Sequence, residues 1–260
     1  MTKIQGARER ARGEITTAIK DEARRQLAAH GAAKLSLRAV ARELGMVSSA
    51  LYRYFPNRDD LLTALITDSY DALGAAAEAA LAHSAEQGDA HLARWQAVCR
   101  AVRGWALDHP HEYALIYGSP VPGYAAPETT TGPAARAALT LITIAADAYA
   151  AGALRVPGAT EDRCAGPGAG FPAASAGPGP DPSVPLPAAP APVLVDTRDL
   201  TERLDVALPA AAMAQLAAVW AQLFGLLSFE LFGQFDGVIA ARDEFFDHAV
   251  VGLARTAGLV

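Results

Sequence analysis

Apolar residues recur every three or four positions through most of this chain, which is the period of amphipathic helices. Between residues 35 and 62 the period breaks into two short segments on either side of a glycine. One face of the first segment carries Leu37, Val40, Ala41 and Leu44. We therefore expect a helix over residues 37–44, with Ser36 as its N-cap and Gly45 in the left-handed conformation after it.

The second segment is bounded at both ends. Ser48 or Ser49 can cap its first turn, and Leu51 and Phe55 are its inward positions. Pro56 disfavours helical geometry at Phe55 and so ends the helix. Two short helices joined by a tight turn predict a helix-turn-helix, although an ordinary helical hairpin without a ligand has the same spacing.

Helical periods also fill much of the remaining chain. A stripe over residues 15–27 precedes the two short helices, and Asn57 can cap a long connecting helix over residues 57–83. Further helices are expected over residues 92–108 and 135–151, and two closing helices within 210–234 and 238–259. We divide the chain into an N-terminal domain, residues 1–56, and a larger helical domain, residues 57–260.

Residues 155–197 have a different composition. They hold ten of the 17 prolines and six glycines, which disfavours both a helix and a buried core. We expect a disordered surface loop that joins two helices of one domain, and a lid over a ligand entrance is the functional alternative.

Charge is distributed unevenly along the chain. The net charge of −6 taken alone argues against a nucleic-acid partner. However, residues 1–60 hold 12 Lys or Arg against 7 Asp or Glu, and the remainder holds 10 against 21. A head of charge +5 on a body of charge −11 concentrates phosphate affinity at one end and orients that end toward DNA.

The stretch LRAVARELGMVSSALYRYFPNRDDLLTALI resembles the DNA-binding domain of the tetracycline-repressor-like (TetR) family of transcriptional regulators. The shared features are A-x-x-L-G, a short helix with L-Y-x-Y-F, and a D-L-L run that opens a long helix. The resemblance implies an all-α fold, in which a three-helix helix-turn-helix DNA-binding domain precedes a larger helical ligand-binding and dimerisation domain. By position, it implies DNA contacts from Ser36, Arg38, Ser48, Ser49, Tyr52, Tyr54 and Arg58.

Val47 departs from the commoner family pattern, which places a hydroxyl residue directly after the turn. Either Ser48 takes over as the cap, or the register of base contacts shifts by one residue. A basic N-terminal arm precedes the motif, and it either reaches into a flanking minor groove or forms a disordered tail. The arm contains Lys3, Arg8, Arg10 and Arg12.

A second resemblance concerns the body. The order Trp105, His109-Pro110, Tyr113, Tyr117-Gly118 is similar to the C-terminal domain of one TetR branch, which is named for its Trp, His and Gly. We expect a small, largely apolar ligand to enter among aromatic side chains, although aromatics at helical spacing are more often core than pocket. The candidate ligand-binding residues are Trp105, His109, Tyr113, Tyr117, Trp220 and Phe224.

No catalytic site, metal site or cofactor is predicted. His109, His111 and Glu112 lack a second cluster of His or Cys that would complete a four-ligand metal site. The titratable groups of the body are scattered, so we do not expect an enzyme. Two cysteines give no disulfide framework and suit the reducing cytoplasm, and the N-terminus lacks the apolar core of a signal peptide.

The closing helices resemble the pair through which TetR proteins dimerise as a four-helix bundle. The first is apolar over more than one stripe, but Gln215, Gln222 and Glu230 interrupt it. We expect its own domain and a partner copy to bury it, and no membrane span.

Together, these features predict a homodimeric transcriptional repressor that binds a palindromic double-stranded DNA operator. A small-molecule effector is expected to release the repressor from DNA. An effector weakens DNA binding when it favours a state in which the spacing of the two DNA-binding domains does not match the operator. The alternative is a DNA-binding regulator without a small-molecule ligand, controlled by its abundance or by a protein partner.

Overall fold

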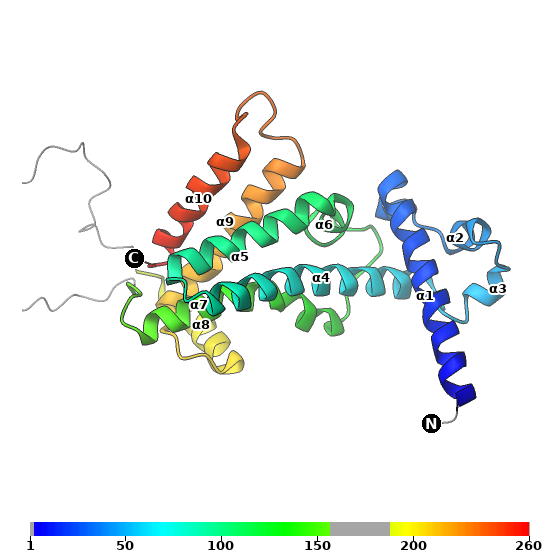
Figure 1. Cartoon of the computed structure of the whole chain (residues 1–260), viewed down its shortest axis with the longest axis horizontal. Helices are drawn as coiled ribbons and strands as arrows, with labels where there is room; N and C mark the ends of the chain where they lie inside the picture. Colours follow the sequence, from blue (N-terminus) through cyan, green and yellow to red (C-terminus); the bar gives the residue numbers. More distant parts are fainter. Residues whose placement is uncertain (1–2, 157–187, 260) are drawn as a thin grey trace, which may run out of the picture.

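The computed structural model describes residues 3–156 and 188–259, which form a small helical head and an elongated helical body (Figure 1). The head contains α1 (Lys3–His30), the 3₁₀ turn η1 (Ala32–Lys34), α2 (Leu37–Glu43) and α3 (Ser48–Leu51). The body contains α4 (Arg58–Glu86), α5 (His91–Asp108), α6 (Pro110–Tyr117), η2 (Glu128–Thr130), α7 (Thr131–Ala150), α8 (Ala191–Leu204), α9 (Ala210–Leu231) and α10 (Arg242–Thr256).

The ends of α2 are where the sequence predicts them. Ser36 is the N-cap, and its Oγ accepts a hydrogen bond from the backbone N–H of Ala39 at 3.5 Å. Gly45 follows the helix with a φ of 62°, a left-handed conformation that glycine adopts at little cost. Both predictions are confirmed. The helices of the head enclose a core of their own that includes Ile19, Ala23, Leu27, Val40, Ala41, Leu51 and Phe55.

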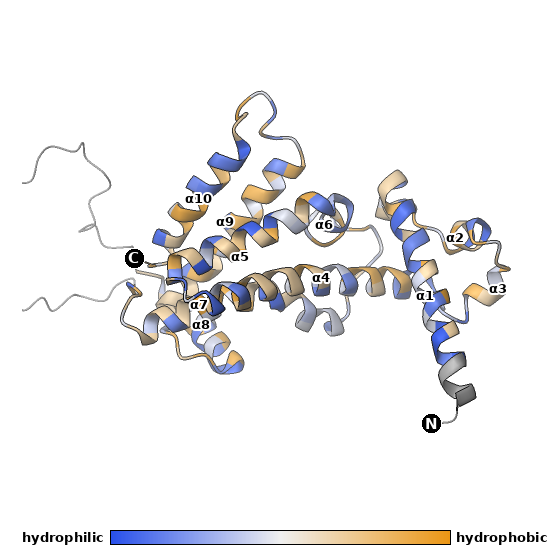
Figure 2. Cartoon of the chain, in the orientation of Figure 1, coloured by the Kyte–Doolittle hydropathy of each residue, from blue (hydrophilic) through white to orange (hydrophobic). Residues whose placement is uncertain are grey.

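Helix α4 belongs to both parts of the molecule. Asn57 is its N-cap, as predicted, and the Asn57 Oδ1 accepts from the backbone N–H of Asp60 at 2.8 Å. Apolar residues recur along the whole helix (Figure 2). Leu61 and Leu65 near its beginning pack into the head core, whereas Leu73 further along packs into the body core. Helix α4 therefore connects the two cores directly.

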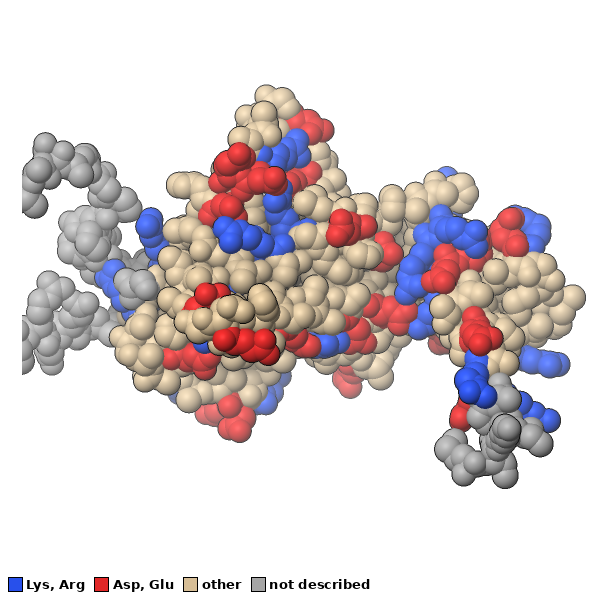
Figure 3. Space-filling view, viewed as in Figure 1, with Lys and Arg blue, Asp and Glu red and all other residues tan. Residues whose placement is uncertain are grey.

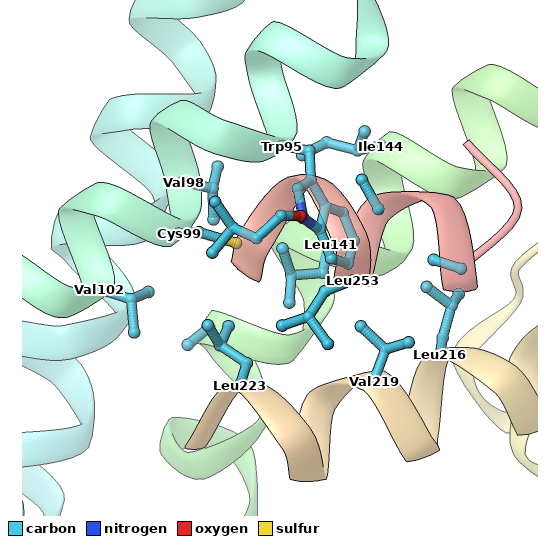
Figure 4. Packing of buried hydrophobic residues seen from close by; sticks show 14 of the residues in the cluster. Trp95, Val98, Cys99, Val102, Leu141, Ile144, Leu216, Val219, Leu223 and Leu253 are labelled. Atoms are coloured by element: carbon cyan, nitrogen blue, oxygen red, sulfur yellow. The ribbon is translucent and has the colours of Figure 1, made fainter. Parts of the chain in front are cut away.

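The core of the body lies between α5, α7, α9 and α10 (Figure 4). Trp95 of α5 is fully buried there, and its indole N–H donates to the carbonyl oxygen of Val250 on α10 at 3.1 Å. Leu141 of α7 and Leu223 of α9 pack in the same cluster. Each large apolar side chain that is fully buried contributes about 1.5–3 kcal/mol. This cluster therefore fixes how the four helices meet.

Two predictions about irregular segments are wrong. Residues 191–197, which we expected in the Pro/Gly-rich loop of 155–197, form the first turns of α8. Proline is tolerated there because the first N–H groups of a helix have no intrahelical acceptor. Residues 157–187 of the predicted loop lie outside the described residues. The basic arm is not a separate tail either, because α1 already begins at Lys3.

The closing helices α9 and α10 lie within the predicted ranges, 210–234 and 238–259, and the turn between them has left-handed glycines at 233 and 237. Of the helices that the structure describes, α9 alone is long and apolar enough to cross a bilayer by length and composition. The core helix of a soluble protein passes the same test, and Met213, Val219 and Leu223 of α9 are buried in the body core.

Candidate nucleic-acid interface and ligand site

Helix α3 begins directly after Val47. Val47 occupies the N-cap position with extended backbone, forms no capping hydrogen bond and exposes 70 % of its surface. Ser48 and Ser49 are already helical, so the prediction that one of them caps α3 is wrong. The backbone conformation determines which residue is the N-cap. The carbonyl oxygen of Val47 accepts a hydrogen bond from the backbone N–H of Ala50 at 2.9 Å, so the helix already begins there. Both serines are left exposed on the first turn.

Helix α2 contributes two of the predicted DNA-binding residues. Ser36 is half-buried, and its hydroxyl oxygen accepts the capping hydrogen bond from Ala39. Its hydroxyl proton therefore remains to donate a hydrogen bond to a DNA phosphate. Arg38 is exposed two residues further on. Within residues 3–156 and 188–259, its guanidinium has no ion pair or side-chain hydrogen bond. Arg38 is therefore free to contact DNA.

The two tyrosines after α3 differ in their surroundings. Tyr52 follows the last residue of α3 and is 41 % exposed. Tyr54 is half-buried against the head core, and the Arg12 guanidinium lies 5.8 Å from the centroid of its ring. Cations favour the face of an aromatic ring, so Tyr54 also holds Arg12 at the surface of the head.

Arg58 is already bonded within the head. Its guanidinium donates to the carbonyl oxygen of Ala32 at 2.8 Å and lies 3.7 Å from the carboxylate of Asp59. These contacts tie the beginning of α4 to η1, which gives Arg58 a structural role. A DNA contact from Arg58 stays a prediction, and it requires a guanidinium N–H that the Ala32 carbonyl does not use.

A basic groove lies beside α3, and the sequence analysis did not predict it. Arg8, Arg12 and Arg53 line a hollow of about 310 Å³ together with Ile15 and Tyr54. None of these arginines pairs with a carboxylate in the part of the chain that the structure describes. Figure 3 shows Lys and Arg side chains gathered along the head.

The sequence signal for this groove was partly visible. The basic arm was recognised, but Arg53 occupies the variable position of L-Y-x-Y-F, and the family pattern draws no attention to that position. In the structure, the basic arm is the first part of α1, and this helical conformation places Arg8 and Arg12 in one groove with Arg53.

Two family models match the chain. Residues 19–65 match a model described as bacterial regulatory proteins of the tetR family, and residues 95–253 match one described as a tetracyclin repressor-like C-terminal domain. The second match alone covers more than half of the 260 residues. The chain belongs to the TetR family. It is therefore a DNA-binding transcriptional regulator and not an enzyme.

Relatives in the TetR family align over nearly the whole chain. HTH-type transcriptional regulator Rv1816 from Mycobacterium tuberculosis (strain ATCC 25618 / H37Rv) is 36% identical over 260 residues, which cover 98% of this chain and 94% of the relative. HTH-type transcriptional regulator Mb1846 from Mycobacterium bovis (strain ATCC BAA-935 / AF2122/97) has the same identity and coverage.

Solved structures of similar proteins share the two-part helical architecture. A protein described as a regulatory protein, SCO4313, is 33% identical with a TM-score of 0.66, covering 94% of this chain and 97% of that one. A protein of unknown function from Rhodococcus sp. RHA1 is 25% identical with a TM-score of 0.60, and 94% of each chain is covered.

In the body of this TetR protein, four of the six candidate ligand residues form an aromatic cluster. The ring centroids of Tyr117 and Phe224 are 4.2 Å apart, those of Tyr113 and Tyr117 are 5.2 Å apart, and those of Trp220 and Phe224 are 5.8 Å apart. The Tyr113 hydroxyl donates to the carbonyl oxygen of Phe224 at 3.0 Å and lies 2.9 Å from the Ser228 Oγ. This cluster fastens α6 to α9.

Burial changes the ionisation of these tyrosines. Burial raises the pKa of Tyr113 to about 12, although its hydrogen bond with Ser228 acts in the opposite direction. Burial also raises the pKa of Tyr117, with smaller contributions from Tyr70 and Tyr113. Both phenols are therefore neutral at physiological pH and act as hydrogen-bonding and packing groups.

The other two candidates lie at the corner between α5 and α6. The rings of Trp105 and His109 are stacked with centroids 5.2 Å apart, and the His109 Nδ1 lies 3.0 Å from the Trp105 carbonyl oxygen. The buried Trp105 Nε1 has no hydrogen-bond partner among the described residues. The structure does not bring all six candidates to one cavity.

The large apolar cavity of the body lies elsewhere, between α7, α8 and α9. Its volume is about 500 Å³, and Trp220 is the one predicted ligand residue that lines it. The cavity was not predicted because its residues from α8, namely Leu200, Arg203 and Leu204, lie in a segment where the sequence analysis expected no helix. Other lining residues are Ala138, Leu139 and Leu216.

No arrangement suited to a metal was found in the part of the chain that the structure describes, where no three His, Cys, Asp or Glu residues form a group. Cys99 is a free thiol in the body core, and burial raises its pKa. A buried thiol of this kind behaves as a small apolar side chain and not as a nucleophile.

Proposed function

We propose that this TetR regulator is a homodimeric repressor, and that a small, largely apolar ligand releases it from a palindromic operator. The observation that carries the proposal is the apolar cavity of about 500 Å³ in the body. This volume lies within the range of pockets for drug-sized ligands, about 300–1,000 Å³. Two helices that line the cavity, α7 and α9, also form the body core with α4.

The exposed face of the head supplies the proposed DNA contacts. Ser48 and Ser49 stand at the start of α3, where the residues of a recognition helix meet base edges. Tyr52 and Arg58 are assigned to phosphates, which position the head without reading sequence. Tyr54 shares this assignment, and Ser36 and Arg38 extend the surface along α2.

The proposed dimer interface uses α9 and α10. One face of α9 carries small residues at helical spacing, Ala214, Ala218, Ala221 and Gly225, followed by Phe229, which is 54 % exposed. Small side chains let two helices approach closely, and an exposed phenylalanine gains free energy when a partner covers it. Two copies are needed because the two halves of a palindromic operator lie about 34 Å apart.

Release requires that the ligand prefers one state of the body. A ligand in the cavity lies against α7 and α9, and α9 is fastened to α6 through Tyr113. Helix α6 in turn meets the head, where the Glu112 carboxylate lies 4.0 Å from the Arg24 guanidinium. If the ligand binds the state with badly spaced heads more tightly, it lowers operator affinity by the ratio of its two affinities.

The DNA-binding assignment is tested on an operator selected from random oligonucleotides. Arg38→Ala combined with Tyr52→Phe should weaken operator binding at least tenfold at fixed salt, measured by fluorescence anisotropy. The matched control is Arg198→Ala with Tyr149→Phe, because both residues are exposed on the body. Unchanged affinity in the first variant would show that this face is not the DNA interface.

The repressor and ligand assignments need separate tests. In vitro transcription from a promoter that contains the selected operator should decrease when the protein is added, and an increase would identify an activator. A thermal-shift screen against a metabolite panel should find a stabilising compound that also lowers operator affinity. A screen in which no compound changes either quantity would favour the regulator without a small-molecule ligand.

A further inference from the structure

The cavity between α7, α8 and α9 has an almost entirely apolar wall. Of its fourteen lining residues, only Thr131 and Arg203 carry side chains with hydrogen-bonding or charged groups, apart from the indole of Trp220. Leucine, isoleucine, methionine and alanine form the rest of the wall. Such a wall offers no partners for a ligand with several polar groups, since each group would be desolvated without a hydrogen bond.

Arg203 is the exception in this wall. It lies near the end of α8, is exposed, and lines the cavity. Asp199 precedes it by four residues, a spacing at which opposite charges pair on a helix. No such pair forms, and Arg203 has no ion-pair or side-chain hydrogen-bond partner within the described ranges. Its guanidinium is thus available at the mouth of the cavity.

Other described arginines of the body are of two kinds. Five are each paired with a carboxylate at 2.8 Å or less: Arg94, Arg100, Arg103, Arg136 and Arg242. Arg198 and Arg255 have no carboxylate partner among the described residues, but unlike Arg203 they do not line the cavity. Arg203 thus combines a place in the wall of an apolar cavity with a guanidinium that has no carboxylate partner among the described residues, so it is placed to receive a carboxylate from a ligand.

We infer that the effector is an amphipathic monoanion, with one apolar chain that fills the cavity and one carboxylate that pairs with Arg203. This inference rests on the proposed function, because it names the ligand class of the same cavity. The apolar wall selects the chain by burial, and the guanidinium selects the head group by a charge-assisted hydrogen bond. A cationic head group on the same chain is rejected by like charge.

The test uses the full-length protein and three probes with the same twelve-carbon chain: dodecanoate, dodecan-1-ol and dodecyltrimethylammonium. Binding is followed below the micelle concentration by the fluorescence of Trp220, which lines the cavity, with a Trp220→Phe variant to assign the signal. Dodecanoate should bind about 10- to 100-fold more tightly than the alcohol, the range that a hydrogen bond to a charged group supplies. The cation should bind most weakly.

Two further variants assign the effect. Arg203→Gln should remove the preference for dodecanoate and leave the affinity for dodecan-1-ol unchanged. Arg198→Gln is the matched control, because Arg198 is exposed on the same helix but does not line the cavity. Ala138→Phe should narrow the cavity and weaken binding of both probes, with Ala138→Leu as a smaller change and retained operator binding as proof of folding.

The outcomes separate the inference from the proposed function. Equal binding of the acid and the alcohol, with no effect of Arg203→Gln, would overturn the inference that the effector is a monoanion. The proposal that an apolar ligand releases the protein from DNA would still stand. Affinities of both probes that stay unchanged in Ala138→Phe would show that the probes bind outside the cavity, which overturns the inference. If no probe binds and a wider screen finds no ligand, both the inference and the ligand-release part of the proposed function are wrong.

Discussion

The guanidinium of Arg24 lies 2.8 Å from the carboxylate of Asp68 and joins α1 of the head to α4 of the body. Lys20 reaches the same carboxylate at 2.8 Å, so one acidic residue holds two cations from the first helix. Together with the shared core along α4, this arrangement fixes the direction in which the head faces. In the proposed dimer, the spacing of the two heads would therefore depend on contacts at the junction of α1 and α4.

Asp68→Asn is expected to leave Lys20 without a carboxylate and to remove one of the two carboxylates that Arg24 contacts at 2.8 Å, the other being Asp21. Because the pairs are partly exposed, the free energy of unfolding should fall by about 1 kcal/mol. Urea denaturation measures this change, and the difference from the wild type should shrink at high salt. Asp199→Asn is the control, since this exposed carboxylate pairs with no described residue. Equal effects of the two substitutions would contradict the account.

Val47→Ser should stabilise the head. The N-cap of α3 has no side-chain acceptor at present, and a serine hydroxyl there would accept a hydrogen bond from the first turn. We expect a gain of about 0.5–1 kcal/mol in the free energy of unfolding. Thermal and urea denaturation measure it, with Val47→Ala as a control that removes the exposed side chain without adding a hydroxyl. A serine variant no more stable than the alanine variant would disprove the capping argument.

Tyr113→Phe should lower stability and flatten its dependence on alkaline pH. Loss of the hydrogen bonds to Phe224 and Ser228 should cost about 1 kcal/mol at pH 8. Burial raises the pKa of Tyr113 to about 12, so between the ordinary value of about 10 and 12 the folded protein keeps a proton that the unfolded chain loses.

The sign of the pH effect follows from linkage. Because the folded state binds more protons in this window, the free energy of unfolding falls as the pH rises through it. The decline should be less steep in Tyr113→Phe than in Tyr149→Phe, a control at an exposed tyrosine. Parallel curves for the two variants would mean that Tyr113 does not titrate as described.

Arg53→Ala should weaken operator binding through phosphates. Arg53 lines the basic groove with Arg8 and Arg12 and has no carboxylate partner in the described part of the chain. The loss should be similar on operator and unrelated DNA, and the slope of log affinity against log salt should fall by about one. Arg25→Ala is the control, because Arg25 is paired with Glu22. A loss confined to the operator would instead assign Arg53 to bases.

The helix-turn-helix could be predicted from the sequence because its ends are set by local chemistry. Ser36 and Asn57 accept hydrogen bonds from the first turns of α2 and α4, and Gly45 adopts a positive φ, each within a few residues of its own position. Val47 shows the limit of this reasoning. A residue with no capping side chain still occupies the cap when the backbone of the turn places it there.

The cavity could not be predicted in the same way, because its wall joins α7 to α8 and α9, which follow about 40 residues later in the sequence. Helix α8 begins beside Pro190 and Pro192, where composition favours a loop although the first turn of a helix tolerates proline. Phe224 and Tyr113 have the spacing of ligand-binding aromatics, yet they pack against each other in the core. Only the tertiary arrangement distinguishes such residues from Trp220, which lines the cavity.

Selection of DNA from random oligonucleotides by the full-length protein tests the central claim most directly. Two copies joined through α9 and α10 should retain an inverted repeat whose half-sites lie about one helical turn, or a multiple of it, apart. The same complex should contain two protein chains by analytical ultracentrifugation. A single unrepeated site bound by one chain, or no enriched sequence at all, would contradict the proposal of a homodimeric repressor at a palindromic operator.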